Sequence, residues 1–138
     1  EGDMRAQIEE EIEKLHMQDK VILTGIRTDV EKFMSCLDVL IFPSIYEGLP
    51  LTLVEAQAAG LPILMSDTIT SNVIVSKGLV YAKSIEADPA QWAECAMKLA
   101  DKSRQNRACQ RERLAQAGYD IRGLADWYQN YLLKMAEE

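Results

Sequence analysis

Two glutamates and the segment between them are the residues of this sequence best suited to chemistry. Seven residues separate Glu47 from Glu55, within a segment that runs from Pro43 to Ala56. Pro50 lies between them, at a position where helix N-termini favour proline. We therefore expect Glu47 on a loop and Glu55 inside the following helix. At about 1.5 Å of rise per residue, Pro50 to Glu55 spans roughly 7.5 Å.

The first turn of this expected helix offers a binding site for an anion. The backbone amides of Leu51 and Thr52 would lack acceptors one turn earlier and would carry the positive end of the helix dipole. A pyrophosphate fits such a position. Glu55 could then hold a vicinal diol such as that of a ribose, and Glu47 could accept hydrogen bonds from sugar hydroxyls. A nucleotide sugar combines these groups; the alternative is an acidic N-terminal turn with one unrelated glutamate.

The rest of the chain alternates short apolar runs with amphipathic stretches. Strands are expected at 21–24, 38–42, 62–65 and 79–82. Helices are expected at 3–15, 29–37, 50–59, 89–102, 104–117 and 121–135, with Asp3 and Asp29 as N-caps. Apolar strands separated by helices indicate an α/β fold, a Rossmann-like parallel sheet with helices on both faces. Ligands of such sheets bind beyond the carboxyl ends of the strands, here in the loops 25–29, 43–50 and 66–72.

The loop and helix resemble a known family signature. The segment is similar to the motif of retaining GT-B glycosyltransferases. The similarity consists of Glu47 and Glu55, with Pro43-Ser44 before them and the residues 56–63 after them. The similarity is to the glycosyl transferases group 1 family, exopolysaccharide and capsule type. It implies the C-terminal, donor-binding half of a GT-B fold, whose strands run in the order 3-2-1-4-5-6. The four expected strands resemble the third to sixth, so we expect 1–138 to be a domain fragment without the first strands and the acceptor domain.

The resemblance implies a role for each residue of this segment. In the family, the first glutamate contacts the donor sugar, loop and helix amides hold the pyrophosphate, and the second glutamate holds the ribose. These roles fall on Glu47 as the catalytic residue, on Gly48, Leu49, Leu51 and Thr52, and on Glu55. Many members have Glu-Pro-Phe-Gly where this chain has 47–50 as Glu-Gly-Leu-Pro, and Pro50 lacks an amide. Arg27 could contact a uracil by stacking or hydrogen bonding, although a solvated surface arginine is the alternative.

Composition excludes several other classes of function. Fifteen basic residues against twenty-two acidic ones give a net charge of -7, which argues against a nucleic-acid partner. The sequence has no Asp-x-Asp pair, so we expect no metal and no cofactor, with the leaving diphosphate stabilised by a helix dipole and by cations outside this chain. Cys36, Cys95 and Cys109 form no C-x-x-C pair. They are expected to be small core residues in a reducing cytosol.

The histidine and four of the aromatic residues are expected to have structural roles. His16 is expected to end the first helix. Core packing, rather than a sugar-stacking platform, is expected for Trp92, Trp127, Tyr128 and Tyr131.

The resemblance thus predicts an enzyme, a glycosyltransferase whose donor is a nucleotide sugar, specifically a UDP-sugar. It would transfer a hexose to an acceptor hydroxyl with retention of configuration, in polysaccharide or glycoconjugate biosynthesis. Its partners would be the donor and the N-terminal acceptor domain of the same enzyme, and the fragment alone is expected to be inactive. We expect a cytoplasmic protein, with peripheral association at the inner membrane face through that other domain as a further option. The alternatives are a phosphorylase or epimerase on the same fold and a non-catalytic binding or interaction module. A phosphorylase would need an extra phosphate site or a pyridoxal lysine, and the chain shows no basic cluster for either.

Overall fold

The N-terminal part of the chain contains one helix. The computed structural model describes residues 2–137, without the side chains of 104–106 and 137, and it divides into two compact units, 1–30 and 31–138. In the first unit, α1 (Arg5–Lys14) begins after Met4, which makes no side-chain cap. The expected Asp3 cap is wrong, because the Arg5 amide bonds to the Gly2 carbonyl and places Asp3 inside that turn. His16 follows the end of the helix with a φ of 53°, as expected for a residue that ends it.

The strand expected at 21–24 does not form. Residues 21–25 have no regular structure, and the Ile22 side chain is 84% exposed. A strand is stable only when its backbone groups bond to a neighbouring strand. The sheet of the described residues contains three other strands and does not pair with this segment. The apolar composition of 21–24 therefore favours a strand, but the strand does not form because no described strand pairs with it.

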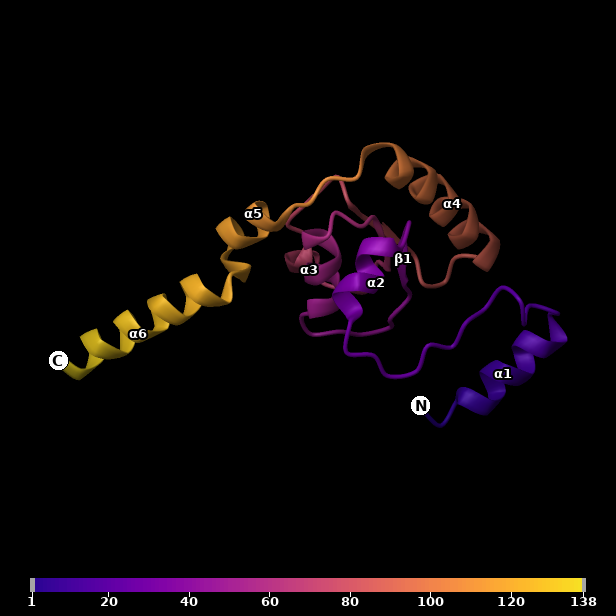
Figure 1. Cartoon of the computed structure of the whole chain (residues 1–138), viewed down its shortest axis with the longest axis horizontal. Helices are drawn as coiled ribbons and strands as arrows, with labels where there is room; N and C mark the ends of the chain where they lie inside the picture. Colours follow the sequence, from indigo (N-terminus) through magenta and orange to yellow (C-terminus); the bar gives the residue numbers. More distant parts are fainter. Residues whose placement is uncertain (1, 138) are drawn as a thin grey trace. The chain divides into compact units, whose positions relative to one another are not determined.

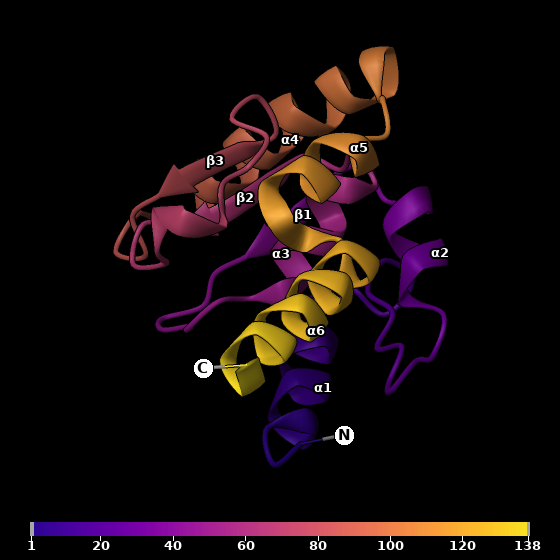
Figure 2. The ribbon, with the colours of Figure 1, turned by 90° about the vertical axis from the view of Figure 1, so that its left-hand side faces the viewer.

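The second unit is built on a parallel sheet. Its strands β1 (Leu40–Phe42), β2 (Ile63–Ser66) and β3 (Val80–Lys83) lie side by side in the order β1-β2-β3 (Figure 2). Leu40 pairs with Ile63, and Ile63 pairs with Val80. The three strands lie within one or two residues of the apolar runs expected at 38–42, 62–65 and 79–82. They confirm the predicted α/β parallel sheet.

Helices cover both faces of this sheet. Because alternate strand residues point to opposite faces, Ile63 and Met65 pack on one side and Leu64 on the other. The first side holds α2 (Val30–Cys36), α3 (Leu51–Ala58) and α5 (Arg111–Leu114), and the second holds α4 (Pro89–Asn106). Figure 1 shows α3 and α4 on opposite sides of the strands. Trp92 on α4 is buried as expected, and its Nε1 donates to the Ser84 carbonyl at 3.0 Å.

The start of α4 follows ordinary capping chemistry and supports a direct test. Asp88 is the N-cap, its Oδ1 accepts from the Ala90 amide at 2.7 Å, and Pro89 occupies the first turn. We expect Asp88→Ala to lower the free energy of unfolding by about 1 kcal/mol, because one first-turn donor loses its partner. Asp88→Asn keeps a side-chain acceptor and should change it much less. Urea denaturation of both variants checks this, and equal losses would contradict it.

The segment after α4 departs from the expected helix at 104–117. Instead, α4 continues to Asn106, an irregular stretch follows, and α5 is short and leads into the π-helical turn η2 (Ala115–Tyr119). The irregular stretch docks on the ends of two helices. The Arg107 guanidinium donates to carbonyls at the end of α2 (Met34, Ser35, Leu37) and to that of Ala59. The Gln110 amide also bonds to the Ala58 carbonyl at 3.0 Å, so these tertiary bonds interrupt the helix.

The C-terminal helix α6 (Ile121–Glu137) lies where it was expected, but its aromatic residues are not in a core. Trp127, Tyr128 and Tyr131 are 58%, 56% and 47% exposed. The Trp127 and Tyr131 rings stack on each other, with centroids 5.5 Å apart. The expectation of core packing is wrong for these three residues, because every side chain described on α6 is exposed.

The cysteines also differ from their expected roles. Cys36 and Cys109 are exposed, so they are not core residues. The Cys109 thiol bonds to the Ala58 carbonyl at 3.2 Å, as part of the stretch that docks on the end of α3. Cys95 is partly buried and packs against the Leu64 cluster under α4, which agrees with the expectation.

Candidate functional site

The N-terminus of α3 presents two free donors. Pro50 is the N-cap, one residue earlier than its expected place in the first turn, and it offers no side-chain cap. The Leu53 amide bonds to the Pro50 carbonyl at 3.0 Å. The amides of Leu51 and Thr52 have no hydrogen-bond partner within the described part of the chain. These are the two donors that the sequence predicts to face an anion.

One side of α3 is buried and the other is exposed. Leu53, Val54, Ala56 and Gln57 are buried against the sheet and its loops. In contrast, Leu51, Thr52 and Glu55 are exposed. Residues three or four apart lie on the same side of a helix, so Glu55 lies one turn beyond the two free amides. The core packing of α3 thus fixes which side faces a ligand.

The buried side of α3 is joined to the segment that leads into β3. Gln57 is fully buried, and its amide nitrogen donates to the carbonyls of Leu53 and Val73 at 3.0 and 2.8 Å. Its amide oxygen accepts from the amides of Val75 and Ser76, both at 2.9 Å. All the main bonding capacity of this side chain is used. It holds α3 and the chain after β2 in one arrangement.

Glu47 lies on the loop between β1 and α3 and is held by a neighbouring hydroxyl. The Ser44 Oγ donates to the Glu47 Oε1 at 2.8 Å, and the Glu47 side chain is partly buried. The second carboxylate oxygen, Oε2, has no partner among the described residues. Gly48 and Leu49 follow it on the exposed loop. Apart from Gly48 and its chain neighbours, no described residue has an atom within 4 Å of the position that a Gly48 Cβ would take, so a ligand could approach its backbone closely.

Sequence reasoning missed two residues that support this loop. The hydroxyls of Ser66 and Thr68, at the end of β2, both bond to the Ser44 carbonyl, Thr68 at 3.1 Å. The hydroxyls of Ser66 and Thr68 are themselves 3.1 Å apart. Because β1 and β2 are parallel neighbours, with Phe42 paired to Met65, the residues just beyond them must lie together. The sequence already places both loops at this edge of the sheet, and that is the signal by which these hydroxyls could have been found.

Arg27 belongs to the first unit and already has a partner. Its Nε and Nη2 donate to the two carboxylate oxygens of Asp29, both at 2.8 Å. These hydrogen bonds lower the pKa of Asp29 and raise the pKa of Arg27. Asp29 directly precedes α2, where an N-cap was expected. A contact between Arg27 and a base therefore stays a prediction.

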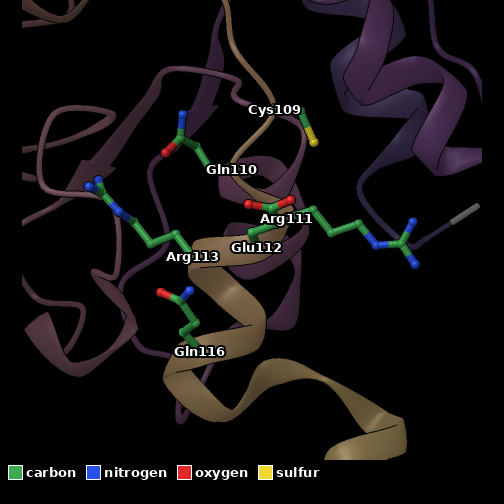
Figure 3. A pocket seen from close by; sticks show the side chains of 6 residues that line it. All are labelled: Cys109, Gln110, Arg111, Glu112, Arg113 and Gln116. Atoms are coloured by element: carbon green, nitrogen blue, oxygen red, sulfur yellow. The ribbon is translucent and has the colours of Figure 1, made fainter.

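A separate cavity of about 560 Å³ lies beside α5, lined by Cys109, Gln110, Arg111, Glu112, Arg113 and Gln116 (Figure 3). Cys109 and Gln110 bond to the Ala58 carbonyl, which lies at the end of α3 opposite the free amides. The guanidinium groups of Arg111 and Arg113 point to opposite sides of α5 (Figure 3). They do not converge on one anion, so this cavity lacks the features of a phosphate site.

Among the side chains that the structure describes, no three of His, Cys, Asp or Glu gather in a way that could hold a metal ion. None of the helices described here has the length and apolar character needed to span a membrane. Independence from metals stays a prediction.

Comparison with known proteins shows the family to which this chain belongs. A model of the family described as glycosyl transferases group 1 matches residues 1–120. The matched region contains the sheet, α3 and both glutamates, and it ends just before α6.

Several individual relatives are named as glycosyltransferases. The chain is 40% identical over 120 residues to the glycosyltransferase EpsF of Bacillus subtilis, covering 87% of this chain and 31% of EpsF. It is 34% identical over 61 residues to an Escherichia coli UDP-Gal:alpha-D-GlcNAc-diphosphoundecaprenol alpha-1,3-galactosyltransferase, covering 44% of this chain and 16% of that enzyme. It is 31% identical over 74 residues to the amylovoran biosynthesis glycosyltransferase AmsK of Erwinia amylovora, covering 48% and 18%. The chain thus spans less than a third of the length of each of these relatives.

Proposed function

Because the chain belongs to the glycosyl transferases group 1 family, we propose that it binds the nucleotide-sugar donor of a hexosyltransferase. The observation that carries this proposal is the pair of unpartnered amides at Leu51 and Thr52, with exposed Glu55 one turn beyond them and Glu47 on the loop before them. An anion at the amides and hydroxyl groups at the two carboxylates would satisfy all four residues. A nucleoside diphosphate sugar carries a ribose, a pyrophosphate and a sugar in sequence, which would face Glu55, the two amides and Glu47 respectively.

Each residue then has one role. The amides of Leu51 and Thr52 donate to the pyrophosphate, with Gly48 and Leu49 on the loop beside it. Glu55 accepts hydrogen bonds from the ribose hydroxyls. Glu47, through its free Oε2, accepts from hydroxyls of the transferred sugar and is the catalytic residue. A carboxylate is a strong acceptor for such hydroxyls, because hydrogen bonds to charged groups are shorter and stronger than neutral ones.

The proposed reaction breaks the bond between the anomeric carbon and the diphosphate and forms a bond from that carbon to an acceptor hydroxyl on the same face. The leaving diphosphate assists removal of the acceptor proton, and no side chain of this site acts as a nucleophile. The dipole of α3 stabilises the charge that develops on the diphosphate, without a metal ion. Cations outside this chain would contribute the rest, since the chain has a net charge of -7.

We further propose a UDP-sugar as the donor and polysaccharide or glycoconjugate assembly as the setting. Two relatives support this choice by name: the Escherichia coli enzyme is named for UDP-Gal, and AmsK is named for amylovoran biosynthesis. The acceptor would be bound by an N-terminal domain of the same protein, since EpsF is aligned over 31% of its length only. Such an enzyme would work in the cytoplasm, at the inner face of the membrane when that other domain binds there.

The role of Glu55 has a specific test. In the full-length protein that contains this chain, Glu55→Gln should weaken UDP binding by about 1.5–3 kcal/mol, the usual contribution of a hydrogen bond to a charged group. The same change should cost much less for 2′-deoxy-UDP, because one of the diol hydroxyls is already absent. Isothermal titration with both nucleotides measures the difference. Equal losses for the two would remove the ribose from the role of Glu55.

A further inference from the structure

Ser44 combines two contacts that bear on the orientation of Glu47. Its hydroxyl donates to Glu47 Oε1 at 2.8 Å, while its backbone carbonyl accepts hydrogen bonds from Ser66 and Thr68. The first contact fixes one carboxylate oxygen. The second fixes the backbone from which that hydroxyl projects. Ser44 is itself partly buried, so solvent competes less for these bonds than at a fully exposed site.

The anchor at the other end of this network is rigid. Ser66 is the last residue of β2, is fully buried, and belongs to a strand paired on both sides. The Thr68 Oγ1 donates to the Ser44 carbonyl at 3.1 Å, and it lies 3.1 Å from the Ser66 Oγ. The hydroxyls therefore connect the carboxylate of Glu47 to the central strand of the sheet in a short series of hydrogen bonds. A loop of this kind would otherwise allow the glutamate several rotamers.

We propose that Ser44 is a positioning residue that holds Glu47 by Oε1 and so presents Oε2 to the donor sugar, with Ser66 and Thr68 holding Ser44 in place. This inference rests on the proposed function of Glu47. A bound sugar then meets a carboxylate that is already oriented, which lowers the cost of forming the transition state. The amides of Leu51 and Thr52 are not part of this network, so the nucleotide should bind independently of it.

The main variant removes the Ser44 hydroxyl in the full-length protein. Ser44→Ala should lower kcat for hexosyl transfer from a UDP-hexose about tenfold to a hundredfold, the equivalent of one hydrogen bond to a charged group. The loss should fall on kcat rather than on KM, because the orientation of Glu47 matters most in the transition state. Affinity for free UDP should stay unchanged. Ser44→Thr keeps a hydroxyl and should recover most of the rate.

Two further variants separate positioning from a general effect on the fold. Thr68→Val keeps the shape of the side chain and removes one of the two donors to the Ser44 carbonyl, so its loss in kcat should be smaller. Ser35→Ala is the matched control, because within the described part of the chain this hydroxyl bonds only to the Glu31 carbonyl, and it should leave kcat unchanged. Thermal denaturation of each variant identifies any that fail to fold, and Thr68→Val then replaces Ser44→Ala in the comparison.

A double-mutant cycle with Glu47→Ala decides the question. If Ser44 acts through Glu47, adding Ser44→Ala to Glu47→Ala should change kcat by less than about twofold. An equal loss in both backgrounds, or no loss from Ser44→Ala while Glu47→Ala is impaired, would overturn the positioning role and leave the proposed function intact. Full activity in Glu47→Ala itself, or no transfer by the unmodified protein, would instead count against the proposed function.

Discussion

Replacing Glu47 by alanine in the full-length protein should lower the rate of hexosyl transfer about a hundredfold to a thousandfold, the range seen when one preorganised polar contact to a transition state is removed. Affinity for free UDP should remain nearly unchanged, because the proposed partner of Glu47 is the sugar, which UDP lacks. The free Oε2 of Glu47 and its position before the α3 amides are the basis of this expectation. Steady-state kinetics and isothermal titration with UDP measure the two quantities.

The control for this prediction is another glutamate on the same unit. Glu112 on α5 is exposed and lines the separate cavity beside that helix, so Glu112→Ala should leave transfer unchanged. If Glu47→Ala weakened UDP binding as much as it slowed transfer, Glu47 would be a nucleotide contact or a structural residue. The sugar contact assigned to it would then be wrong.

The largest effect on stability is expected at Gly60. This residue ends α3 with a φ of +69°, a left-handed conformation that costs little only for glycine. A Cβ here would lie 2.1 Å from the Ala108 carbonyl oxygen, in the stretch that Arg107 and Gln110 tie to the ends of α2 and α3. Neither side of this contact can move without breaking those hydrogen bonds. We expect Gly60→Ala to lower the free energy of unfolding by about 3 kcal/mol or more.

A second glycine provides the comparison for this measurement. Gly78 has no left-handed φ, and among the residues that the structure describes only its chain neighbours lie within 4 Å of a potential Cβ. Gly78→Ala should therefore change the free energy of unfolding by less than about 0.5 kcal/mol. Urea denaturation of both variants in the full-length protein measures the difference. Similar stabilities for Gly60→Ala and the unmodified protein would show that the docked stretch can move away from α3.

Most of the sheet and of the candidate site could be predicted from the sequence, because both depend on local patterns. Apolar runs without alternation predict buried parallel strands, and three of the four form. Glu47 comes just before the start of a helix and Glu55 lies within it. The rise of the helix therefore predicts how far Glu55 lies beyond the helix start. The free amides of Leu51 and Thr52 follow from the helix start alone, and the structure confirms them. The exposure of Glu55 follows instead from the burial of the opposite side of α3.

The features that the sequence did not predict depend on partners distant along the chain. Residues 21–24 have the composition of a strand, but strand formation requires a neighbour, and composition does not report one. Trp127, Tyr128 and Tyr131 have core-like spacing on α6, yet spacing does not say which surface would cover them. The Arg107 guanidinium bonds to carbonyls that lie 48 to 73 residues earlier in the chain. These bonds interrupt an expected helix. Local sequence carries no signal for such contacts.

The central claim is that the nucleotide diphosphate binds at the first turn of α3, and amide chemical shifts test it most directly. The full-length protein would be labelled with ¹⁵N at leucine and threonine and titrated with UDP. The amides of Leu51 and Thr52 should shift in a saturable way, as they gain charge-assisted hydrogen bonds to phosphate oxygens. The same shifts should appear in Glu47→Ala. Saturable binding of UDP that leaves both amides unshifted would contradict the assignment of the site.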